Sequence, residues 1–281
     1  RDVYDLHLSS FPDLSPKPVA AGTTEFSFSD DGRWLARLEG FEPGVKPDLV
    51  VGPSDGSGGR KLGPEVEQYA FSPDSKHMGM LAKYSDAARA GTLTIAALPD
   101  GEIKPLGARV PNFAWSGDGR SVAFIQRFLD PIYSVDLMVH PLGAEAPVKV
   151  GKGVFGYGFT PDHQDVLFRT ACIREGRACN LMRVPALRPD TAPRLIAEGI
   201  YGYKVSEDSQ RLLVTFARTE SDTYDVAIRK PDGTGHRTLH TGAKLPVFLA
   251  GKDGGRVVFA VGQGREGVYT ATTEPGQAQA K

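Results

Sequence analysis

The stretch Phe113-Ala114-Trp115-Ser116-Gly117-Asp118-Gly119-Arg120-Ser121-Val122-Ala123-Phe124-Ile125 decides the fold of this chain. Residues 112–116 alternate polar and apolar side chains, which is the period-2 pattern of a β-strand. Gly117–Arg120 is expected to form a hairpin turn, because glycine supplies positive φ and Asp118 can cap its own backbone. Residues 121–125 are apolar on both faces, as expected for a buried returning strand. The stretch therefore predicts a tight β-hairpin.

This pattern of aromatic residue, small polar residue and aspartate occurs six times in the 281 residues. The interval between successive copies is 43, 44, 44, 46 and 45 residues, as judged from Asp31, Asp74, Asp118, Asp162, Asp208 and Asp253. Each hairpin is followed by two further strand-type segments, which lie at 135–140 and 148–150 in the third copy. A period in the forties with four strands per repeat is typical of propeller blades. We therefore predict an all-β fold, a β-propeller of four-stranded antiparallel blades.

The two ends of the chain predict how the propeller is organised. Residues 3–8 have the pattern of a third strand and residues 17–20 that of a fourth strand, so the chain opens on the outer half of a blade. We expect these N-terminal strands, near 3–20, to complete the last blade and protect its edge. This favours six blades within a single domain over 1–281, although one surplus strand leaves seven blades as an alternative. The chain starts at Arg1 without a Met or a signal-peptide pattern, so we expect a processed or trimmed form.

Large side chains recur at two positions of the first strand in each repeat. We expect them to fill the core between adjacent blades, because large aromatic side chains suit the wedge-shaped space between neighbouring sheets. The alternative is a circle of ligand-binding aromatic residues at the channel mouth. The first position is occupied by Phe26, Tyr69, Phe113, Tyr157, Tyr203 and Phe248, and the second by Phe28, Phe71, Trp115, Phe159 and Val205.

The repeated aspartate is expected to cap its turn by accepting backbone N–H bonds. A calcium site would need several oxygen ligands, and each turn supplies one or two. We therefore predict no metal site at the turns.

Cys172 and Cys179 flank a plausible hairpin tip at residues 173–178. On two paired strands they could lie opposite each other at disulfide distance; the alternative is two reduced thiols beside a loop. Because disulfides persist in oxidising compartments, a bond here favours a periplasmic or extracellular location.

The bulk composition argues against several classes of function. The net charge is −1, with 33 basic and 34 acidic residues, which disfavours a general electrostatic grip on nucleic acid or anionic membrane. No apolar stretch approaches the roughly 20 residues of a membrane helix. A Gly-x-Ser-x-Gly elbow, a dinucleotide fingerprint and a converging histidine cluster are not found in the sequence. We therefore predict no catalytic residues, no metal and no cofactor.

The repeat resembles the TolB-type propeller repeat, a relative of the WD repeat. The matching residues are Tyr69–Leu81 and Phe113–Ile125, while Glu207, Gly251 and Lys252 depart from the usual Ser-Pro pattern. The resemblance implies a propeller fold. The family includes the periplasmic TolB protein, which binds a peptidoglycan-associated lipoprotein, as well as propeller domains of peptidases and some polysaccharide lyases.

The resemblance and the missing catalytic pattern together favour a non-catalytic, protein-binding scaffold of a bacterial envelope or secreted assembly. The alternative is an enzyme acting on a glycan or peptide in the channel, or the propeller part of a peptidase. Loops on one rim carry the apolar groups of Phe41, Tyr84, Phe128 and Tyr133 where turns are usually polar, which points to an interface with a protein partner. Local packing of each loop on its own blade is the other interpretation. The candidate binding residues are Phe41, Tyr84, Arg89, Phe128, Asp130 and Tyr133.

Overall fold

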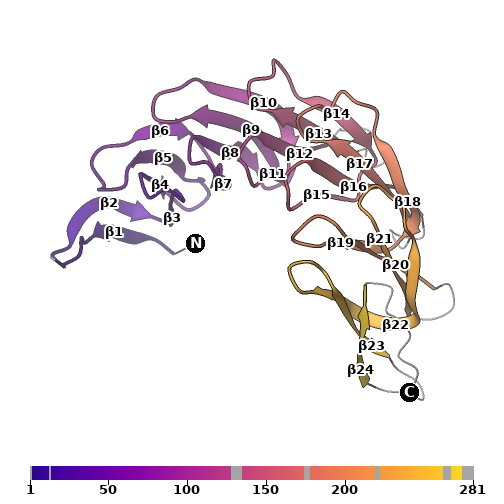
Figure 1. The fold of residues 1–281 in the computed structure, drawn as a ribbon. Helices are drawn as coiled ribbons and strands as arrows, with labels where there is room; N and C mark the ends of the chain where they lie inside the picture. Colours follow the sequence, from indigo (N-terminus) through magenta and orange to yellow (C-terminus); the bar gives the residue numbers. More distant parts are fainter. Residues whose placement is uncertain are drawn as a thin grey trace. The chain divides into compact units, whose positions relative to one another are not determined.

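The chain is an all-β protein. The computed structural model describes residues 2–12, 14–127, 135–173, 178–218, 222–261 and 267–273, which contain β-strands and no helix (Figure 1). Contacts within the chain divide it into two units, residues 1–148 and 149–281. The expectation of one domain over 1–281 stays a prediction.

The first unit begins with a two-stranded antiparallel hairpin, formed by β1 (Tyr4–Leu8) and β2 (Lys17–Thr23). Two four-stranded sheets follow, and a third begins here and ends with the strand that crosses into the second unit. Their strands are β3 (Glu25–Phe28), β4 (Trp34–Glu39), β5 (Asp48–Pro53) and β6 (Arg60–Gly63); β7 (Gln68–Phe71), β8 (His77–Ser85), β9 (Ala90–Ala97) and β10 (Ile103–Val110); and β11 (Phe113–Trp115), β12 (Ser121–Arg127), β13 (Val135–Pro141) and β14 (Val148–Lys152).

The second unit contains one four-stranded sheet and one six-stranded sheet. The strands of the four-stranded sheet are β15 (Gly156–Phe159), β16 (Asp165–Ile173), β17 (Ala178–Pro185) and β18 (Arg194–Ile200). Those of the six-stranded sheet are β19 (Gly202–Val205), β20 (Leu212–Ala217), β21 (Tyr224–Arg229), β22 (Arg237–Ala250), β23 (Arg256–Val261) and β24 (Gly267–Thr272). The 14-residue strand β22 serves two repeats, as the fourth strand of the fifth and the first strand of the sixth.

The sheet count therefore fits the six expected blades. Five repeats each supply four antiparallel strands, and the sixth supplies the end of β22 with β23 and β24. Completion of the sixth set by the N-terminal hairpin stays a prediction.

The turn between the first and second strands is built in the same way in every repeat. The aspartate accepts the backbone N–H two residues further on, at 3.0 Å for Asp31 and 2.9 Å for Asp253. The residue after each aspartate has positive φ, between 55° and 71°, which glycine adopts freely and other residues adopt with strain. The interpretation of the repeated aspartate as a turn cap is confirmed.

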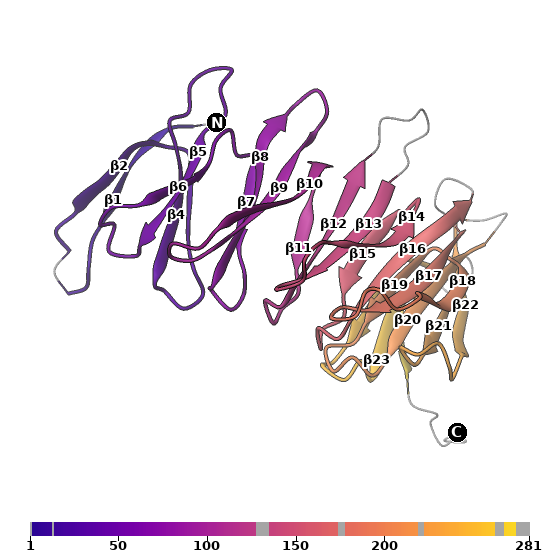
Figure 2. The ribbon, with the colours of Figure 1, turned by 90° about the horizontal axis from the view of Figure 1, so that it is seen from above.

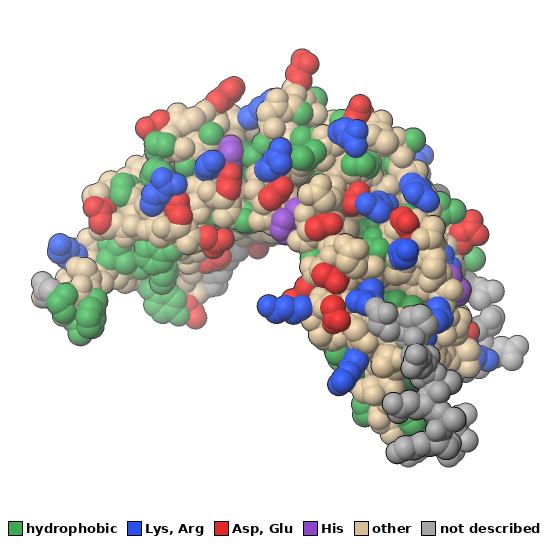
Figure 3. All heavy atoms as spheres, viewed as in Figure 1, with side chains coloured by type: hydrophobic (Ala, Val, Ile, Leu, Met, Phe, Trp, Pro, Cys, Tyr) green, Lys and Arg blue, Asp and Glu red, His purple; other side chains and the backbone are tan. Residues whose placement is uncertain are grey.

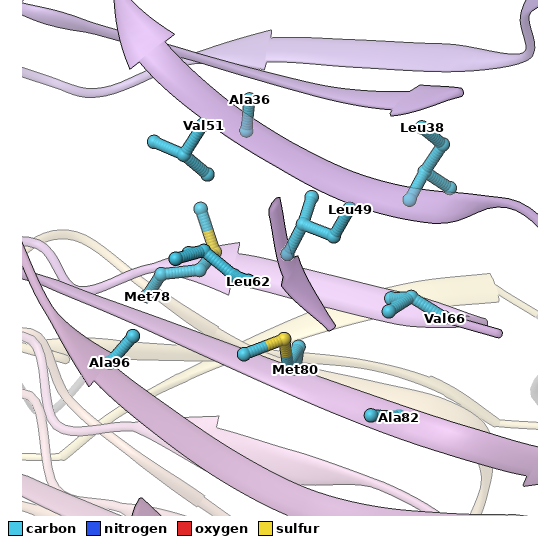
Figure 4. Close-up of a cluster of buried hydrophobic side chains, with 10 residues drawn as sticks. All are labelled: Ala36, Leu38, Leu49, Val51, Leu62, Val66, Met78, Met80, Ala82 and Ala96. Atoms are coloured by element: carbon cyan, nitrogen blue, oxygen red, sulfur yellow. The ribbon is translucent and has the colours of Figure 1, made fainter. Parts of the chain in front are cut away.

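The core lies between neighbouring sheets. In the first unit, Leu38, Leu49 and Leu62 of the first four-stranded sheet pack against Met78 and Met80 of the second, and all five are buried (Figure 4). The two sheets stand side by side in both ribbon views (Figure 1, Figure 2). Burying each such side chain contributes about 1.5–3 kcal/mol. Tyr69 and Phe71 pack against the edge of this cluster, as predicted.

The first-strand rings point toward the preceding sheet. The indole Nε1–H of Trp115 donates to the carbonyl oxygen of Ala70, and the phenol of Tyr203 donates to that of Leu167, both at 3.2 Å. Phe26 has only the β1–β2 hairpin before it in its unit.

The core prediction is wrong for Phe26 and Phe28, which are 51% and 45% exposed. The physical reason is that no four-stranded sheet precedes them within their unit. Hydrophobic side chains gather at this end of the first unit, over β1 to β3 (Figure 3).

The prediction is also wrong for Phe248, which is 48% exposed. In the first five repeats six residues separate the last pair of the hairpin, as between Val205 and Leu212, but only five separate Ala250 and Arg256. A slip of one residue turns every side chain of a strand to the other face. Val247 therefore lies in the core in place of Phe248.

The predicted pairing of the two cysteines is confirmed, since Cys172 and Cys179 form a disulfide. A regular register from Thr170 opposite Asn180 would place Ala171 opposite Cys179. Ala171 instead adopts a φ of 48° at a β-bulge, after which Ile173 pairs with Ala178. The bulge brings Cys172 into line with Cys179.

Candidate functional site

The loop residues expected to bind a partner are partly engaged with the first unit itself. Lys46 Nζ lies 5.3 Å from the ring centroid of Tyr84 and forms ion pairs with Glu67 at 2.6 Å and Asp86 at 2.9 Å. Burial opposes the charge of Lys46, but its bonds to Glu67 and Asp86 outweigh burial and raise its pKa. Tyr84 is thus half-buried under a charged network that joins three loops.

The other candidates divide into two groups. Phe41 is half-buried and Arg89 is exposed, with its backbone N–H donating to Asp86 at 3.2 Å. Phe128, Asp130 and Tyr133 lie outside the described residues.

A different site stands out in the second unit, where an aromatic-Gly-Tyr triplet occurs twice. Phe155-Gly156-Tyr157 opens β15 and Tyr201-Gly202-Tyr203 opens β19. Together with Arg169 of β16 they line a depression of about 550 Å³, which we call the aromatic groove. In the other repeats the corresponding triplets are Thr24-Glu25-Phe26, Glu67-Gln68-Tyr69, Pro111-Asn112-Phe113 and Pro246-Val247-Phe248. The first two positions of the triplet are therefore not dictated by the fold.

Arg169 departs even more clearly from the repeat. It pairs with Gly156 across the β15–β16 ladder, at a position where the other repeats place small or apolar side chains. Counted from the repeat aspartate, as Arg169 is from Asp162, these are Leu38, Leu81, Ile125, Thr215 and Ala260. A guanidinium at a position of this kind costs desolvation free energy unless it has partners, so its presence indicates a role beyond packing.

The contacts of Arg169 hold the two triplets together. Its Nη1–H donates to the carbonyl oxygen of Tyr201, and its guanidinium lies 5.2 Å from the ring centroid of Phe155. The Phe155 N–H donates to the carbonyl oxygen of Arg169 at 2.8 Å. These hydrogen bonds fix the local backbone, and the Phe155 ring is 58% exposed.

The tyrosines of the groove play different parts. The Tyr201 ring rests on the buried Tyr224, with ring centroids 4.8 Å apart, so its orientation is fixed. Burial raises the pKa of Tyr203 to about 12, although the charge of Arg169 opposes the rise. Burial also raises the pKa of Tyr157 well above its usual range. Both phenols therefore stay protonated at neutral pH and act as hydrogen-bonding groups, not as bases.

A smaller pocket lies on the other face of β19 and shares residues 201–203 with the groove. It has a volume of about 240 Å³, and its wall includes the apolar side chains of Leu213, Leu245, Pro246 and Val247. We call it the apolar pocket. Lys204 lies at its margin, with Nζ 5.4 Å from the ring centroid of Phe248.

A larger depression of about 850 Å³ in the same unit is rich in arginine, but its arginines are engaged within the chain. Arg183 is paired with the buried Asp165 at 2.5 Å. Arg229 donates to the carbonyl oxygen of Ile196 at 3.2 Å, and Arg237 to that of Thr273 at 2.6 Å. These bonds stabilise turns, so this depression is a weaker candidate than the aromatic groove.

The loops between second and third strands, where the sequence favours binding residues, do not contain Phe155, Arg169 or Tyr201, so these three were missed. Two signals in the residues mark them: the doubled aromatic-Gly-Tyr triplet, and an arginine in a column of small and apolar residues.

Neither a metal centre nor a membrane-spanning helix is found in the described parts of the chain. Among the described ranges, no three His, Cys, Asp or Glu side chains gather in a way that could hold a metal ion. No helix in those ranges has the length and apolarity that crossing a bilayer requires.

Comparison with known proteins shows the class of fold. No family model matches the chain, and no curated protein matches its sequence. Among solved structures, a eukaryotic initiation factor matches with a TM-score of 0.60 at 11% identity, over 95% of this chain and 71% of that one. The β-propeller domain of the Trilobed protease from Pyrococcus furiosus matches with a TM-score of 0.51 at 14% identity, over 90% and 83%. The fold is therefore that of the β-propellers.

Solved TolB structures are also matched. TolB from Acinetobacter baumannii has a TM-score of 0.40 and 16% identity, and the match covers 81% of this chain and 57% of that one. An oligogalacturonate lyase and acylaminoacyl peptidases are further matches. At these identities the likenesses concern the fold alone.

Proposed function

We propose that this protein is a non-catalytic scaffold that binds another protein in a bacterial envelope or secreted assembly. The observation that carries the proposal is the aromatic groove, where Phe155 and Tyr201 are presented by hydrogen-bonded strands at positions that the repeat fills otherwise. Because Phe155 is exposed and the half-buried Tyr201 is held against Tyr224, the two rings can contact a partner with little loss of conformational entropy.

The disulfide between Cys172 and Cys179 supports the location. It links β16 to β17 at the end of the hairpin that carries Arg169. Because such bonds persist in oxidising compartments, we place the protein in the periplasm or outside the cell.

The loops of the first unit are a second proposed contact surface. Phe41, Tyr84 and Arg89, together with Phe128, Asp130 and Tyr133, remain our candidates there. Arg89 is exposed and therefore the best placed of the described three.

A capture experiment tests the proposal. The full chain is used as bait in an envelope extract, the captured protein is identified, and its affinity is measured with the purified pair. Replacing Phe155 and Tyr201 together by threonine, the residue at this position in the first repeat, should weaken binding at least tenfold while the far-ultraviolet circular dichroism spectrum stays that of the wild type. Phe11→Ser, which alters an aromatic residue that is 90% exposed in the first unit, is the control and should bind normally.

Two results would contradict the proposal. One is equal binding by the double variant. The other is turnover of a glycan or peptide by the purified chain, which would show the enzyme that the sequence leaves as the alternative.

A further inference from the structure

We propose that the aromatic groove and the apolar pocket together bind an extended segment of a polypeptide that carries a carboxylate next to an apolar side chain. This inference rests on the proposed function and adds the chemistry that the partner must present. Three features of the second unit carry it: the state of Arg169, the charge of the groove, and the wall of the apolar pocket.

Arg169 has donors to spare. A guanidinium has five N–H groups in a planar fork. The hydrogen bond that its side chain makes within the described residues goes to the carbonyl oxygen of Tyr201, and its other side-chain contact is the ring of Phe155. Its half-buried place explains why an external acceptor would be favoured, since a carboxylate satisfies two of these donors at once.

The charge of the groove is complementary to such a ligand. Of its seven lining residues, Arg169 is the one with a formal charge, and none is Asp or Glu. Lys204 at the margin of the apolar pocket adds a second positive group. The arginines of the larger depression differ, because Arg183 there already has Asp165 as its carboxylate. Arg169 thus offers a positive site that the chain does not neutralise in its described parts.

The apolar pocket favours a polypeptide over a sugar. Leu213, Leu245 and Val247 present aliphatic groups that cannot bond to hydroxyls. Its volume of about 240 Å³ exceeds the roughly 150 Å³ of an apolar cavity known to admit benzene, so a leucine or phenylalanine side chain fits. Desolvating an aliphatic side chain there adds affinity, whereas desolvating sugar hydroxyls would cost it.

The two sites lie on the two faces of β19, which is the edge strand of its sheet, and both use Tyr201, Gly202 and Tyr203. Successive side chains of an extended segment alternate in direction, and every second one points the same way. A segment that crosses the edge of the sheet at β19 would place a carboxylate on one side and an apolar side chain, one or two residues away, on the other. The carboxylate can come from Asp or Glu or from a chain terminus, and the experiment separates these sources.

The glycines of the triplets keep this space open. Gly156 and Gly202 stand where other repeats place Glu25, Gln68 and Asn112, so the strand tolerates long side chains at this position. A Cβ added to Gly156 would lie 3.6 Å from Nη2 of Arg169, which is an ordinary contact. Gly156→Gln therefore fills the groove with a residue that the second repeat already uses.

The test is a selection of random heptapeptides displayed on phage, with the full chain as the immobilised target. One library ends in a free C-terminal carboxylate and the other displays the heptapeptide internally. We expect enriched peptides to carry an acidic group one or two residues from Leu, Ile, Val or Phe, and the library in which they appear identifies the source of the carboxylate. Synthetic copies should lose about tenfold or more of their affinity when the carboxylate is replaced by its amide.

Variants of the chain show whether the peptides use this site. Arg169→Leu restores the residue of the first two repeats and should fold normally, yet lose about tenfold or more in affinity for the same peptides. Gly156→Gln should lose affinity similarly. Arg120→Leu, at an exposed turn of the first unit, is the matched control and should bind as the wild type does.

Several outcomes would overturn the inference. These are enrichment no greater on the wild type than on Arg169→Leu, selected peptides without a carboxylate, and Arg169-dependent binding of an acidic oligosaccharide such as oligogalacturonate. If Arg169→Leu captures the partner protein normally while the Phe155 and Tyr201 double variant does not, the carboxylate inference is wrong and the proposed function stands.

Discussion

Removing one buried hydroxyl should show how much each repeat turn contributes to stability. The Ser72 side chain is buried, with Oγ donating to Asp74 Oδ1 at 2.5 Å and accepting the N–H of His77 at 2.9 Å. Ser72→Ala deletes both bonds and leaves the His77 N–H without this acceptor at the start of β8. A buried donor that loses its partner costs about 1–3 kcal/mol, and the lost bond to the carboxylate about 1 kcal/mol more. We expect a loss of about 2–4 kcal/mol.

Both tryptophans of the chain, Trp34 and Trp115, lie in the unit that contains Ser72. Their fluorescence during urea unfolding therefore reports on that unit without a two-state assumption for the whole chain. A loss of this size corresponds to a fall in melting temperature of about 5–12 °C for about 150 residues.

Two variants serve as controls for Ser72→Ala. Ser72→Thr keeps the hydroxyl, as Thr160 does in the fourth repeat, and should cost less than about 1 kcal/mol. Ser57→Ala removes a hydroxyl with the same 2.5 Å bond to an aspartate, but in an exposed turn, and should change stability by less than about 0.5 kcal/mol. Equal effects of Ser72→Ala and Ser57→Ala would refute the reasoning, because burial is what distinguishes them.

Three further predictions concern other parts of the chain. The bonds that Asp31 accepts from the Arg33 N–H and the Ser29 hydroxyl lower its pKa to about 2, from a usual 3.8. A carboxylate with a lowered pKa stabilises the folded state above its unfolded-state pKa, so stability should fall as the pH drops from about 4 to 2. Asp31→Asn should flatten this pH dependence when unfolding is followed during acid titration. The bond between Cys172 and Cys179 closes a short loop and should contribute about 2.5 kcal/mol to the free energy of unfolding, which chemical unfolding of the double serine variant, followed by circular dichroism, can measure. The intact mass of the unreduced protein should be lower by two hydrogens. Two freely alkylated thiols in protein from its native compartment would contradict the bond. In the sixth repeat, Val247→Ala should cost about 1–2 kcal/mol and Phe248→Ser less than about 0.5, and the reverse order in thermal melts would contradict the shifted register.

The sequence predicted the fold well because the turn signal repeats. Each copy places an aspartate before a residue that must accept positive φ, and this local chemistry does not depend on distant contacts. The strand patterns on either side then determine the sheets. The hairpin in β16 and β17 also allowed the disulfide to be predicted, although the bulge at Ala171 that aligns the cysteines has no clear signal in the residues.

Two features could not be predicted in the same way. The exposure of Phe26 depends on which sheet stands before it, which is a tertiary property. The exposure of Phe248 depends on a one-residue difference in hairpin length, and the altered Gly251 and Lys252 marked this repeat as unusual without giving its register.

The aromatic groove shows a different limit of prediction from the sequence. A common pattern reveals the scaffold, because the pattern records what every blade needs. Binding residues are found where one or two blades abandon it, as with Arg169 in a column of small and apolar residues. The departures of single repeats from their shared pattern, position by position, therefore carry the information about the groove that the pattern itself lacks.

The left-handed position after each repeat aspartate has a consequence for engineering. Glycine occupies it at residues 32, 119 and 254, but Ser75 and Ser209 hold it with φ of 59° and 55°. Their hydroxyls accept the backbone N–H of Asp31 and Asp162, at 3.2 and 2.9 Å, from the neighbouring repeat. A designer who averaged the six copies into one idealised module would choose glycine here, which relaxes the backbone but removes these hydrogen bonds between repeats. Each module would then be more stable by itself, but neighbouring modules would be held together less strongly. An array built from such modules should therefore unfold blade by blade instead of in one cooperative transition.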